Sequence, residues 1–369
     1  MTRGPRFTPL VESLPATVPF VGPEAQERAA GRAFRARIGA NESVFGPSPK
    51  AIAAMQNAAA ECWMYADPEN HDLKRDLARH HGVKPENIVV GEGIDALLGY
   101  AVRMVIEPGQ AVISSLGAYP TFNFHVAGFG GKLVRVPYTG DREDPQALID
   151  AAKREDAKLV YFANPDNPMG SWWSARDVQR LIEDLPGGAV LLLDEAYSDT
   201  APADAIPPID VSNPQVLRLR TFSKAYGLAG LRVGYAIGEA NLIRAFDKIR
   251  NHFGVNRMAH AAAAAALADQ DYLARVIAEI AHARDRIGEI ARANGLTALP
   301  SATNFVAIDC GGDGVLAKRV LEELIARDVF VRMPGVAPLD RCIRISAGRD
   351  ADLAILTETL PEALRAARS

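Results

Sequence analysis

Cysteine is scarce in this sequence. Its 369 residues include three cysteines, Cys62, Cys310 and Cys342, which lie far apart and form no CxxC pair. An odd number of isolated thiols is not the disulfide framework of a secreted protein. The seven histidines include no HExxH spacing, so the usual pattern of metal ligands is missing too. We therefore expect a reducing compartment, the cytoplasm, and no metal site.

Long apolar runs are missing as well. The most apolar segment, 258–268, is an alanine-rich stretch about half as long as a membrane-spanning helix. Five prolines interrupt residues 1–26, which therefore lack the apolar core of a secretion signal. The formal net charge of −4 offers no basic surface for nucleic acid or anionic lipid. We expect no membrane and no nucleic acid as partner, and a small molecule as ligand.

Apolar residues, in contrast, are plentiful: 48% of the chain is hydrophobic and 23% is charged, enough to bury a core. A length of 369 residues favours two domains over one. From residue 87 to residue 238, short β-branched runs alternate with helical stretches. This pattern is typical of an α/β layer with a mostly parallel sheet and helices on both faces. The predicted strands are 88–90, 111–113, 132–136, 159–162, 190–193, 216–219 and 233–237, and the helices between them include 95–106, 145–154 and 175–185.

After residue 240 the pattern changes to long alanine-rich helices and then to short strands. We expect a smaller α+β domain here, with helices over 241–249, 259–268, 271–293, 314–327 and 350–367 and strands over 304–309, 329–332 and 342–346. The predicted division of the chain is an N-terminal arm, 1–40, that packs on the small domain, then a large domain, 41–250, and a small domain, 251–369.

A glycine-rich turn follows the first predicted strand of the sheet. The turn leads into a helix, where the backbone N–H groups of Gly93, Ile94 and Asp95 can hold a phosphate. A dinucleotide site would also need an acidic residue about 20 positions later for the ribose. Residues 108–140 contain no Asp or Glu. The turn therefore predicts a phosphate site without NAD, or a tight turn without a ligand.

Other strand ends carry polar residues. Asp194 ends a fully apolar strand, where a buried carboxylate would need a cationic partner unless it caps a helix. Lys224 lies among small and apolar residues, with Arg232 eight positions later. A desolvated lysine can form an imine, whereas a surface lysine is simply solvated. The proline-punctuated turn 164–170 can present an amide side chain.

In this order, these segments resemble the fold-type I pyridoxal-phosphate aminotransferases of class I and II, and most of all the histidinol-phosphate aminotransferase group. The matching motifs are the helix start at 93, the Asn-Pro turn at 164–170, Asp-Glu-Ala-Tyr at 194–197 and Ser-Lys-x-x-Gly-Leu-x-Gly-x-Arg at 223–232. The resemblance implies an enzyme that moves an amino group between an amino acid or amino-alcohol phosphate and a 2-oxo acid. It also implies a homodimer with shared active sites.

The resemblance implies a role for each matching residue. Lys224 would hold pyridoxal 5'-phosphate as a Schiff base and move a proton. Asp194 would pair with the pyridinium nitrogen, and Tyr197 would bind the phenolic oxygen. The remaining cofactor contacts would be Tyr119 and Asn167 at the ring, and Gly93, Ile94, Asp95, Thr221, Ser223, Arg232 and Tyr65 of the partner subunit at the phosphate.

The substrate contacts that the resemblance implies are fewer. Arg344 would take the substrate carboxylate or a phosphate in its place, with Arg332 and Asn41 beside it. In the arm, Phe20 lacks the hydroxyl that the histidinol-phosphate group places near the substrate phosphate, and Glu24 has the wrong charge for it. An aminotransferase for another amino acid, aromatic or not, and a decarboxylase of an amino acid phosphate are therefore alternatives on the same scaffold.

Overall fold

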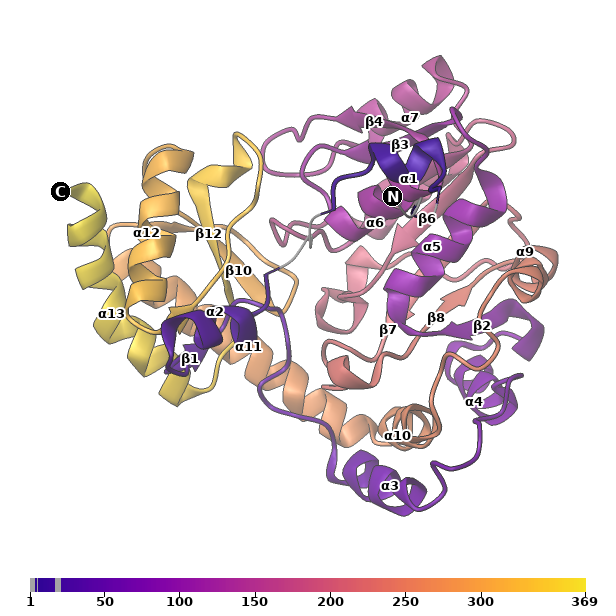
Figure 1. Ribbon diagram of the computed structural model, residues 1–369, viewed down its shortest axis with the longest axis horizontal. Coiled ribbons are helices and arrows are strands. Elements are labelled where there is room, and N and C mark those ends of the chain that lie inside the picture. The colour runs from indigo at the N-terminus through magenta and orange to yellow at the C-terminus, as the bar shows by residue number, and fades with distance from the viewer. Residues whose placement is uncertain (1–3, 5, 17–20) are drawn as a thin grey trace.

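A seven-stranded sheet lies at the centre of the larger part of the molecule (Figure 1). From one edge to the other its strands are β2 (Ile88–Gly91), β8 (Gly234–Ile237), β7 (Val216–Thr221), β6 (Val190–Asp194), β5 (Leu159–Ala163), β3 (Ala111–Ser115) and β4 (Lys132–Val136). β8 is antiparallel to both of its neighbours, and the other adjacent pairs are parallel. The computed structural model describes residues 4, 6–16 and 21–369. It confirms the predicted, mostly parallel sheet.

Helices cover both faces of this sheet. They are α5 (Gly93–Val105) and α6 (Pro120–Gly128) on one face and α7 (Pro145–Arg154) and α8 (Ala175–Glu183) on the other. Side chains alternate along the strands, so that Tyr161 and Ala163 pack under α5 and α6 while Val160 and Phe162 face α7 and α8. Because both of their faces are buried, the central strands β5 and β6 are almost entirely apolar. Each of the seven strands is recognisable in the sequence.

A three-stranded antiparallel sheet forms the second part of the molecule (Figure 1). Its strands are β9 (Thr297–Ala298), β10 (Phe305–Asp309) and β12 (Cys342–Ser346), packed with α11 (Gln270–Ala293), α12 (Gly314–Ala326) and α13 (Asp350–Arg368). α10 (Arg257–Leu267) instead packs on α3 (Pro49–Ala59) and α4 (His71–His81). The division at residue 250 stays a prediction. It depends on α10, which follows residue 250 in the chain but packs on helices that precede it.

Several prolines that interrupt the sequence stand at the starts of helices. Pro9, Pro23, Pro49 and Pro120 are each the first residue of a helix, where the missing N–H group costs no hydrogen bond. These prolines begin α1 (Pro9–Ser13), α2 (Pro23–Ala30), α3 and α6. From the sequence we predict no helix at these four places, and the prolines of residues 1–26 are interpreted there as breaks. Within the described ranges, no helix combines the length and the apolar character needed to cross a membrane.

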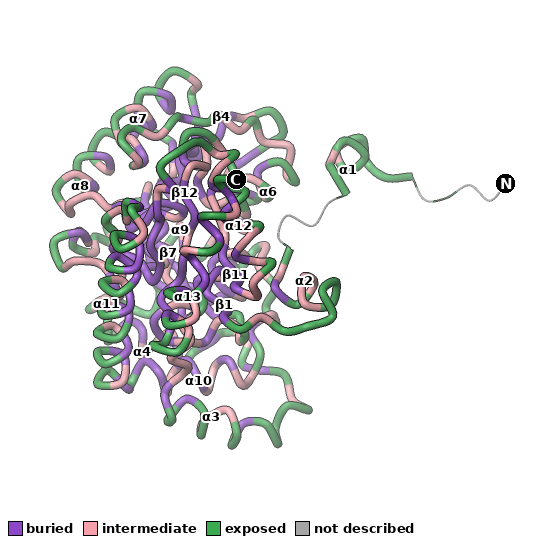
Figure 2. The backbone as a smooth tube through the Cα atoms, turned by 90° about the vertical axis from the view of Figure 1, so that its left-hand side faces the viewer, coloured by how far each residue is buried: buried purple, intermediate pink, exposed green. Residues whose placement is uncertain are grey.

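Residues 21–40 are tied to the second part of the molecule. β1 (Ala36–Arg37) pairs in parallel with β11 (Val329–Phe330), and Arg32 forms an ion pair of 2.6 Å with Asp328. β11 is shorter than the predicted strand 329–332, since its partner has only two residues. α1 and α2 lie on the same side of the molecule, with α1 farther out (Figure 2). An arm over the whole of 1–40 stays a prediction.

A close contact at Gly117 joins the two parts. Gly117, after β3, has φ +102°, and a Cβ atom there would lie 2.6 Å from Cγ2 of Val336, which precedes β12. Glycine is therefore required for the backbone conformation and for the approach of the loop that carries Val336. Val336 packs in a small apolar cluster with Met169 and Leu339. This contact fixes one side of the space between the two sheets.

Gly117→Ala is expected to destabilise the fold by about 1–3 kcal/mol, because the new methyl group is both overpacked and on a residue with positive φ. Urea unfolding measures the change. Gly140→Ala is the control, since Gly140 also has a positive φ, +57°, but nothing lies within 4 Å of its Cβ position. Adding Val336→Ala should restore part of the stability lost in Gly117→Ala and none of the stability lost in Gly140→Ala. Equal losses for the two alanine variants would contradict the steric explanation.

Candidate active site

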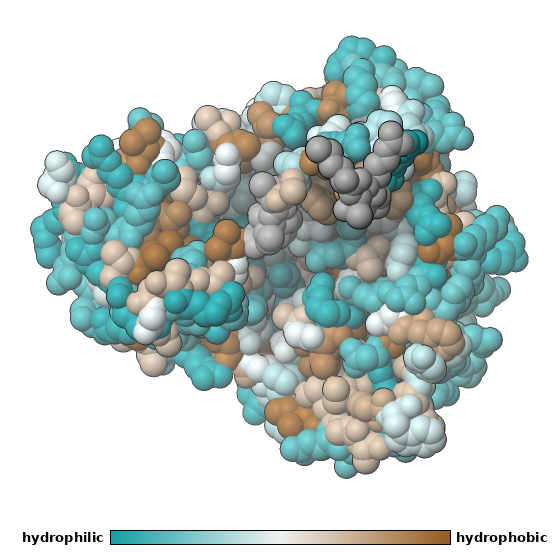
Figure 3. Space-filling model, viewed as in Figure 1, coloured by the Kyte–Doolittle hydropathy of each residue, from teal (hydrophilic) through white to brown (hydrophobic). Residues whose placement is uncertain are grey.

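Two adjoining cavities open between the two parts of the molecule (Figure 3). The first cavity, of about 400 Å³, is lined by residues at the carboxyl ends of β5, β6 and β7 and at the start of α5. The second, of about 460 Å³, is lined by the loop after β3, by α6 and β4, and by residues 332–336. Lys224, Tyr119, Asn167 and Ala40 line both. The carboxyl ends of the strands are where a sheet of this type is expected to bind its ligand.

Lys224 follows β7 and lies at the junction of the two cavities. Its Nζ donates a hydrogen bond of 3.4 Å to the carbonyl oxygen of Asn41 and lies 5.4 Å from the centre of the Tyr197 ring. Within the described ranges, no carboxylate forms an ion pair with this amine. A half-buried lysine without a salt bridge can act as a nucleophile or a base.

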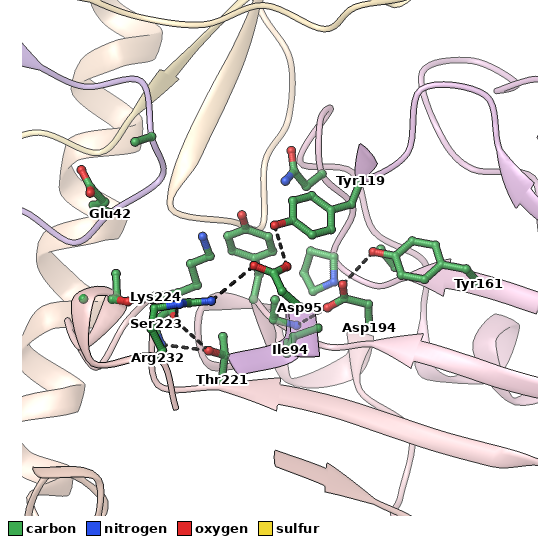
Figure 4. Close-up of a pocket in the computed structure, with 18 residues that line it drawn as sticks. Glu42, Ile94, Asp95, Tyr119, Tyr161, Asp194, Thr221, Ser223, Lys224 and Arg232 are labelled. Atoms are coloured by element: carbon green, nitrogen blue, oxygen red, sulfur yellow. Dashed lines mark hydrogen bonds and ion pairs between the residues drawn. The ribbon is translucent and has the colours of Figure 1, made fainter. Parts of the chain in front are cut away.

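Asp194 is the buried acid on the floor of the first cavity. It is 6% exposed, and its carboxylate accepts hydrogen bonds from the Tyr161 hydroxyl, 2.7 Å, and the Ala196 N–H, 2.9 Å (Figure 4). Burial raises the pKa of Asp194 to about 6. No ion pair within the described ranges offsets this burial. A cation bound in the first cavity would stabilise the ionised carboxylate.

Tyr161 is a site residue that sequence reasoning missed. It lies within an apolar strand, its ring stacks on Phe122 at 4.7 Å, and its hydroxyl reaches Asp194 on the neighbouring strand. The contact follows from the register, which places Asp194 opposite Ala163, two residues after Tyr161 and on the same face. The only sequence signal for this role is that Tyr161 brings a hydroxyl group into an otherwise apolar strand.

An anion cradle lies at the other end of the first cavity. α5 begins here without a side-chain cap, so its first N–H groups are available to a ligand. Arg232 lies over this helix start: its guanidinium is 3.3 Å from Asp95 Oδ2 and 3.4 Å from Ser223 Oγ, which accepts from Thr221 (Figure 4). Gly93 has φ +81°, a backbone conformation that favours glycine, and it lies directly under the Arg232 guanidinium. The phosphate residues predicted in this chain, apart from Tyr65, are therefore together.

Arg344 projects from β12 into the second cavity. Its Nη1 donates to Asn167 Oδ1 at 2.5 Å, its guanidinium lies 5.1 Å from the centre of the Phe305 ring, and its Nε has no hydrogen-bond partner. Burial lowers the pKa of Arg344 to about 10. Arg332 lines the same cavity, exchanges backbone hydrogen bonds with Arg344 and donates to the Val21 carbonyl. Both predicted substrate arginines are thus at the site.

Asn41 links the two parts of the molecule behind Lys224. It is 3% exposed, and its Nδ2 donates to the Tyr197 hydroxyl at 3.2 Å. Ser346 Oγ donates to its Oδ1, and Asn304 donates to its carbonyl oxygen. Asn41 thereby fixes Tyr197 beside the amine of Lys224. Its prediction as a substrate contact has support only in that it lines the second cavity.

The structure does not bring every predicted residue to the cavities. Glu24 is exposed in α2 and forms an ion pair with Arg37, away from both cavities. Tyr65 is 78% exposed and packs on Phe253 with the ring centres 4.8 Å apart, so it lines neither cavity of its own chain. Phe20 lies outside the described residues.

The first cavity has the features needed for pyridoxal phosphate. The buried Asp194 lacks a cationic partner, which a pyridinium nitrogen would supply. The uncapped start of α5 with Arg232, Thr221 and Ser223 suits a phosphate. Lys224 lies between these two ends, where an aldehyde carbon would meet its amine. The observed donor set therefore fits the cofactor that the sequence predicts.

Comparisons with known proteins agree with this geometry. The model of the family "Aminotransferase class I and II" matches residues 37–360. A histidinol-phosphate aminotransferase of Mesorhizobium japonicum is 35% identical over 324 residues, which cover 86% of this chain and 87% of the relative.

Two solved structures show the same architecture. That of histidinol-phosphate aminotransferase from Sinorhizobium meliloti in complex with pyridoxal-5'-phosphate has a TM-score of 0.96 at 58% identity and covers 99% of both chains. The aspartate aminotransferase from Rhizobium meliloti has a TM-score of 0.81 at 22% identity, with 98% of this chain and 100% of that chain covered. The second similarity concerns the fold alone. Together they confirm the predicted fold type I.

Asp194→Asn is expected to stabilise the cofactor-free protein at pH 8 by up to about 3 kcal/mol. The pKa of Asp194 is about 6 in the folded protein against an ordinary value of 3.8. The folded state therefore binds more protons than the unfolded state between pH 4 and pH 6, and stability falls as the pH rises through that window. Melting temperatures of the two proteins should converge near pH 4 and separate above pH 6. Exposed Asp150→Asn is the control. A difference that is the same at every pH would contradict the argument.

Proposed function

Since the chain belongs to the class I and II aminotransferase family, we propose that it moves the amino group of histidinol phosphate to a 2-oxo acid. It is a pyridoxal-phosphate-dependent aminotransferase. The observation that carries the proposal is that Lys224 lines both cavities. One amine is thereby placed between a site for the cofactor and a cationic site for the substrate.

Each residue of the first cavity would have a chemical role that follows from its position. When bound, pyridoxal phosphate supplies a ring that accepts the electron pair released at the substrate carbon. Asp194 holds the proton on the ring nitrogen, and Tyr161 keeps that carboxylate oriented. Lys224 Nζ removes the proton from the substrate carbon that carries the amino group, and Tyr197 and Asn41 keep the amine in place.

The second cavity supports a phosphorylated amine as substrate. Arg344 has an unused Nε donor and a guanidinium that can bind a phosphate in two-point geometry. Glu24, whose charge would oppose a phosphate, is neutralised by Arg37 outside the cavity. Of the two objections that the sequence raises to histidinol phosphate, the charge of Glu24 is thereby reduced, whereas the missing hydroxyl of Phe20 still stands. An aminotransferase for another amino acid and a decarboxylase of an amino acid phosphate are the outcomes that the test below separates.

A homodimer is part of the proposal. Trp63, Tyr65 and Phe253 are 82%, 78% and 52% exposed, an unusual concentration of aromatic surface. Tyr65 would reach the phosphate end of the first cavity in the partner subunit. A cytoplasmic location stays a prediction, in keeping with the free thiols of the three cysteines.

Lys224→Ala is expected to abolish amino transfer without unfolding the protein, since the half-buried amine makes only one weak hydrogen bond. Loss of the cofactor's long-wavelength absorbance is measured after adding histidinol phosphate, phenylalanine, glutamate or aspartate. The wild type should react with histidinol phosphate and the variant with none of the four. Retained turnover in the variant would contradict the role of Lys224. Reaction of the wild type with other amino acids only, or release of carbon dioxide, would contradict the substrate.

Co-expression of Lys224→Ala and Tyr65→Ala chains is expected to give activity that neither variant has alone. In a mixed dimer, one site combines an intact Lys224 with an intact Tyr65 from the partner subunit. Lys224→Ala co-expressed with Asp194→Asn is the control, because both residues belong to the same subunit's cavity and no mixed dimer has an intact site. No recovery in the test pair would show that Tyr65 serves its own chain or no site at all. Recovery in the control would show that the regained activity does not come from sites shared between subunits.

A further inference from the structure

One wall of the second cavity is built by α6 and the edge strand β4, and it carries Asn123 and Arg135. Leu133 packs under α6 while Val134 and Val136 face α7, so the alternation along β4 turns Arg135 to the α6 side. Asn123 Oδ1 is buried there without a hydrogen-bond partner. Neither residue has a role in the function derived above.

Arg135 has no ionic partner in the described part of the chain. Arg135 is an exposed residue, and its guanidinium forms no hydrogen bond or ion pair with any described residue. The neighbouring chain offers no acid either, since residues 108–140 contain no Asp or Glu. An arginine aimed at a cavity without such a partner keeps all of its donors for a ligand.

The charge of the second cavity points to an anionic ligand with more than one contact point. Its lining includes Arg135, Arg332, Arg344 and Lys224, and among the described residues it includes no Asp or Glu. The first cavity, in contrast, has Glu42, Asp95 and Asp194 opposite its two cations. The acids near Arg332 and Arg344, which are Glu42 and Asp166, do not line the second cavity. Four cations in one cavity repel each other until anions enter it.

The cations of the second cavity occupy different positions along it. Arg344 contacts Asn167, which lines both cavities, so it lies near the reacting amine. Arg135 lines the second cavity only, as does Asn123 on the same wall. We propose that Arg135, supported by Asn123, is a specificity residue that binds an anionic group at the end of the substrate remote from the amino carbon. The inference rests on the proposed aminotransferase site, and the remote group is the side-chain carboxylate of an amino acid or 2-oxo acid, since Arg344 takes the α-carboxylate or the phosphate in its place.

Arg135→Gln tests the proposal when its effect on two substrate pairs is compared. Glutamate and norvaline differ by a side-chain carboxylate, and histidinol phosphate and histidinol differ by a phosphate. The expected result is a loss of about 10–100-fold in kcat/KM for glutamate, with norvaline, histidinol phosphate and histidinol unchanged. A loss for histidinol phosphate alone would overturn the side-chain carboxylate as the group that Arg135 binds. Lys132→Gln is the matched control, because Lys132 lies on the same strand but pairs with Glu155 at 2.9 Å.

A binding measurement keeps the test independent of turnover. Succinate and butyrate do not react, and their Kd values follow from the change in cofactor absorbance. Arg135→Gln should weaken succinate about 10-fold or more and leave butyrate unchanged. Equal losses for charged and uncharged ligands, no loss for either, or the same loss in Lys132→Gln would overturn the role of Arg135. A wild type that does not accept histidinol phosphate would overturn the proposed substrate alone, since the glutamate pair and the succinate titration still report on Arg135.

Discussion

The carboxylate of Asp194 ends a strand whose other residues are all apolar, and it is buried with two hydrogen bonds and no ion pair among the described residues. Burial of an ionisable group without a counter-charge costs several kcal/mol, so the folded chain holds a site that is incomplete without its ligand. The rest of the first cavity follows from this constraint. Tyr161 orients the acid by a hydrogen bond, and the uncapped start of α5 can bind the other end of a ligand. Lys224 lies between the acid and this helix start.

Charge separates the two cavities that meet at Lys224. In the first, acids and cations are nearly balanced, which suits a zwitterionic ring that stays bound through the reaction. In the second, all the charged residues of the described lining are cations, which suits anions that enter and leave. Because the amine of Lys224 lies between these two environments, the same residue can act on the bound cofactor and on the substrate.

Much of this arrangement can be predicted from the sequence, and the exceptions have physical causes. The central strands β5 and β6 are almost entirely apolar, and Asp194, Thr221 and Lys224 stand out in the sequence because they are polar residues at or just after strand ends. Tyr161 and Arg135 cannot be found in this way, since their roles depend on register and on which face of a strand they occupy. Glu24 illustrates the reverse error: its place in the sequence suggests a substrate contact, but an ion pair with Arg37 holds it elsewhere.

Asn41 also sets a condition on how the protein is made. Its N–H donates to Ser346, 305 residues later in the chain, and its carbonyl oxygen accepts from Asn304. β1 likewise has no strand to pair with until residues 329 and 330 of β11 have been synthesised. Contacts between such distant segments form late, because the intervening chain must first be present and folded. During synthesis, the seven-stranded sheet can assemble with its acid and lysine in place, whereas the support behind Lys224 must wait until almost the whole chain has left the ribosome.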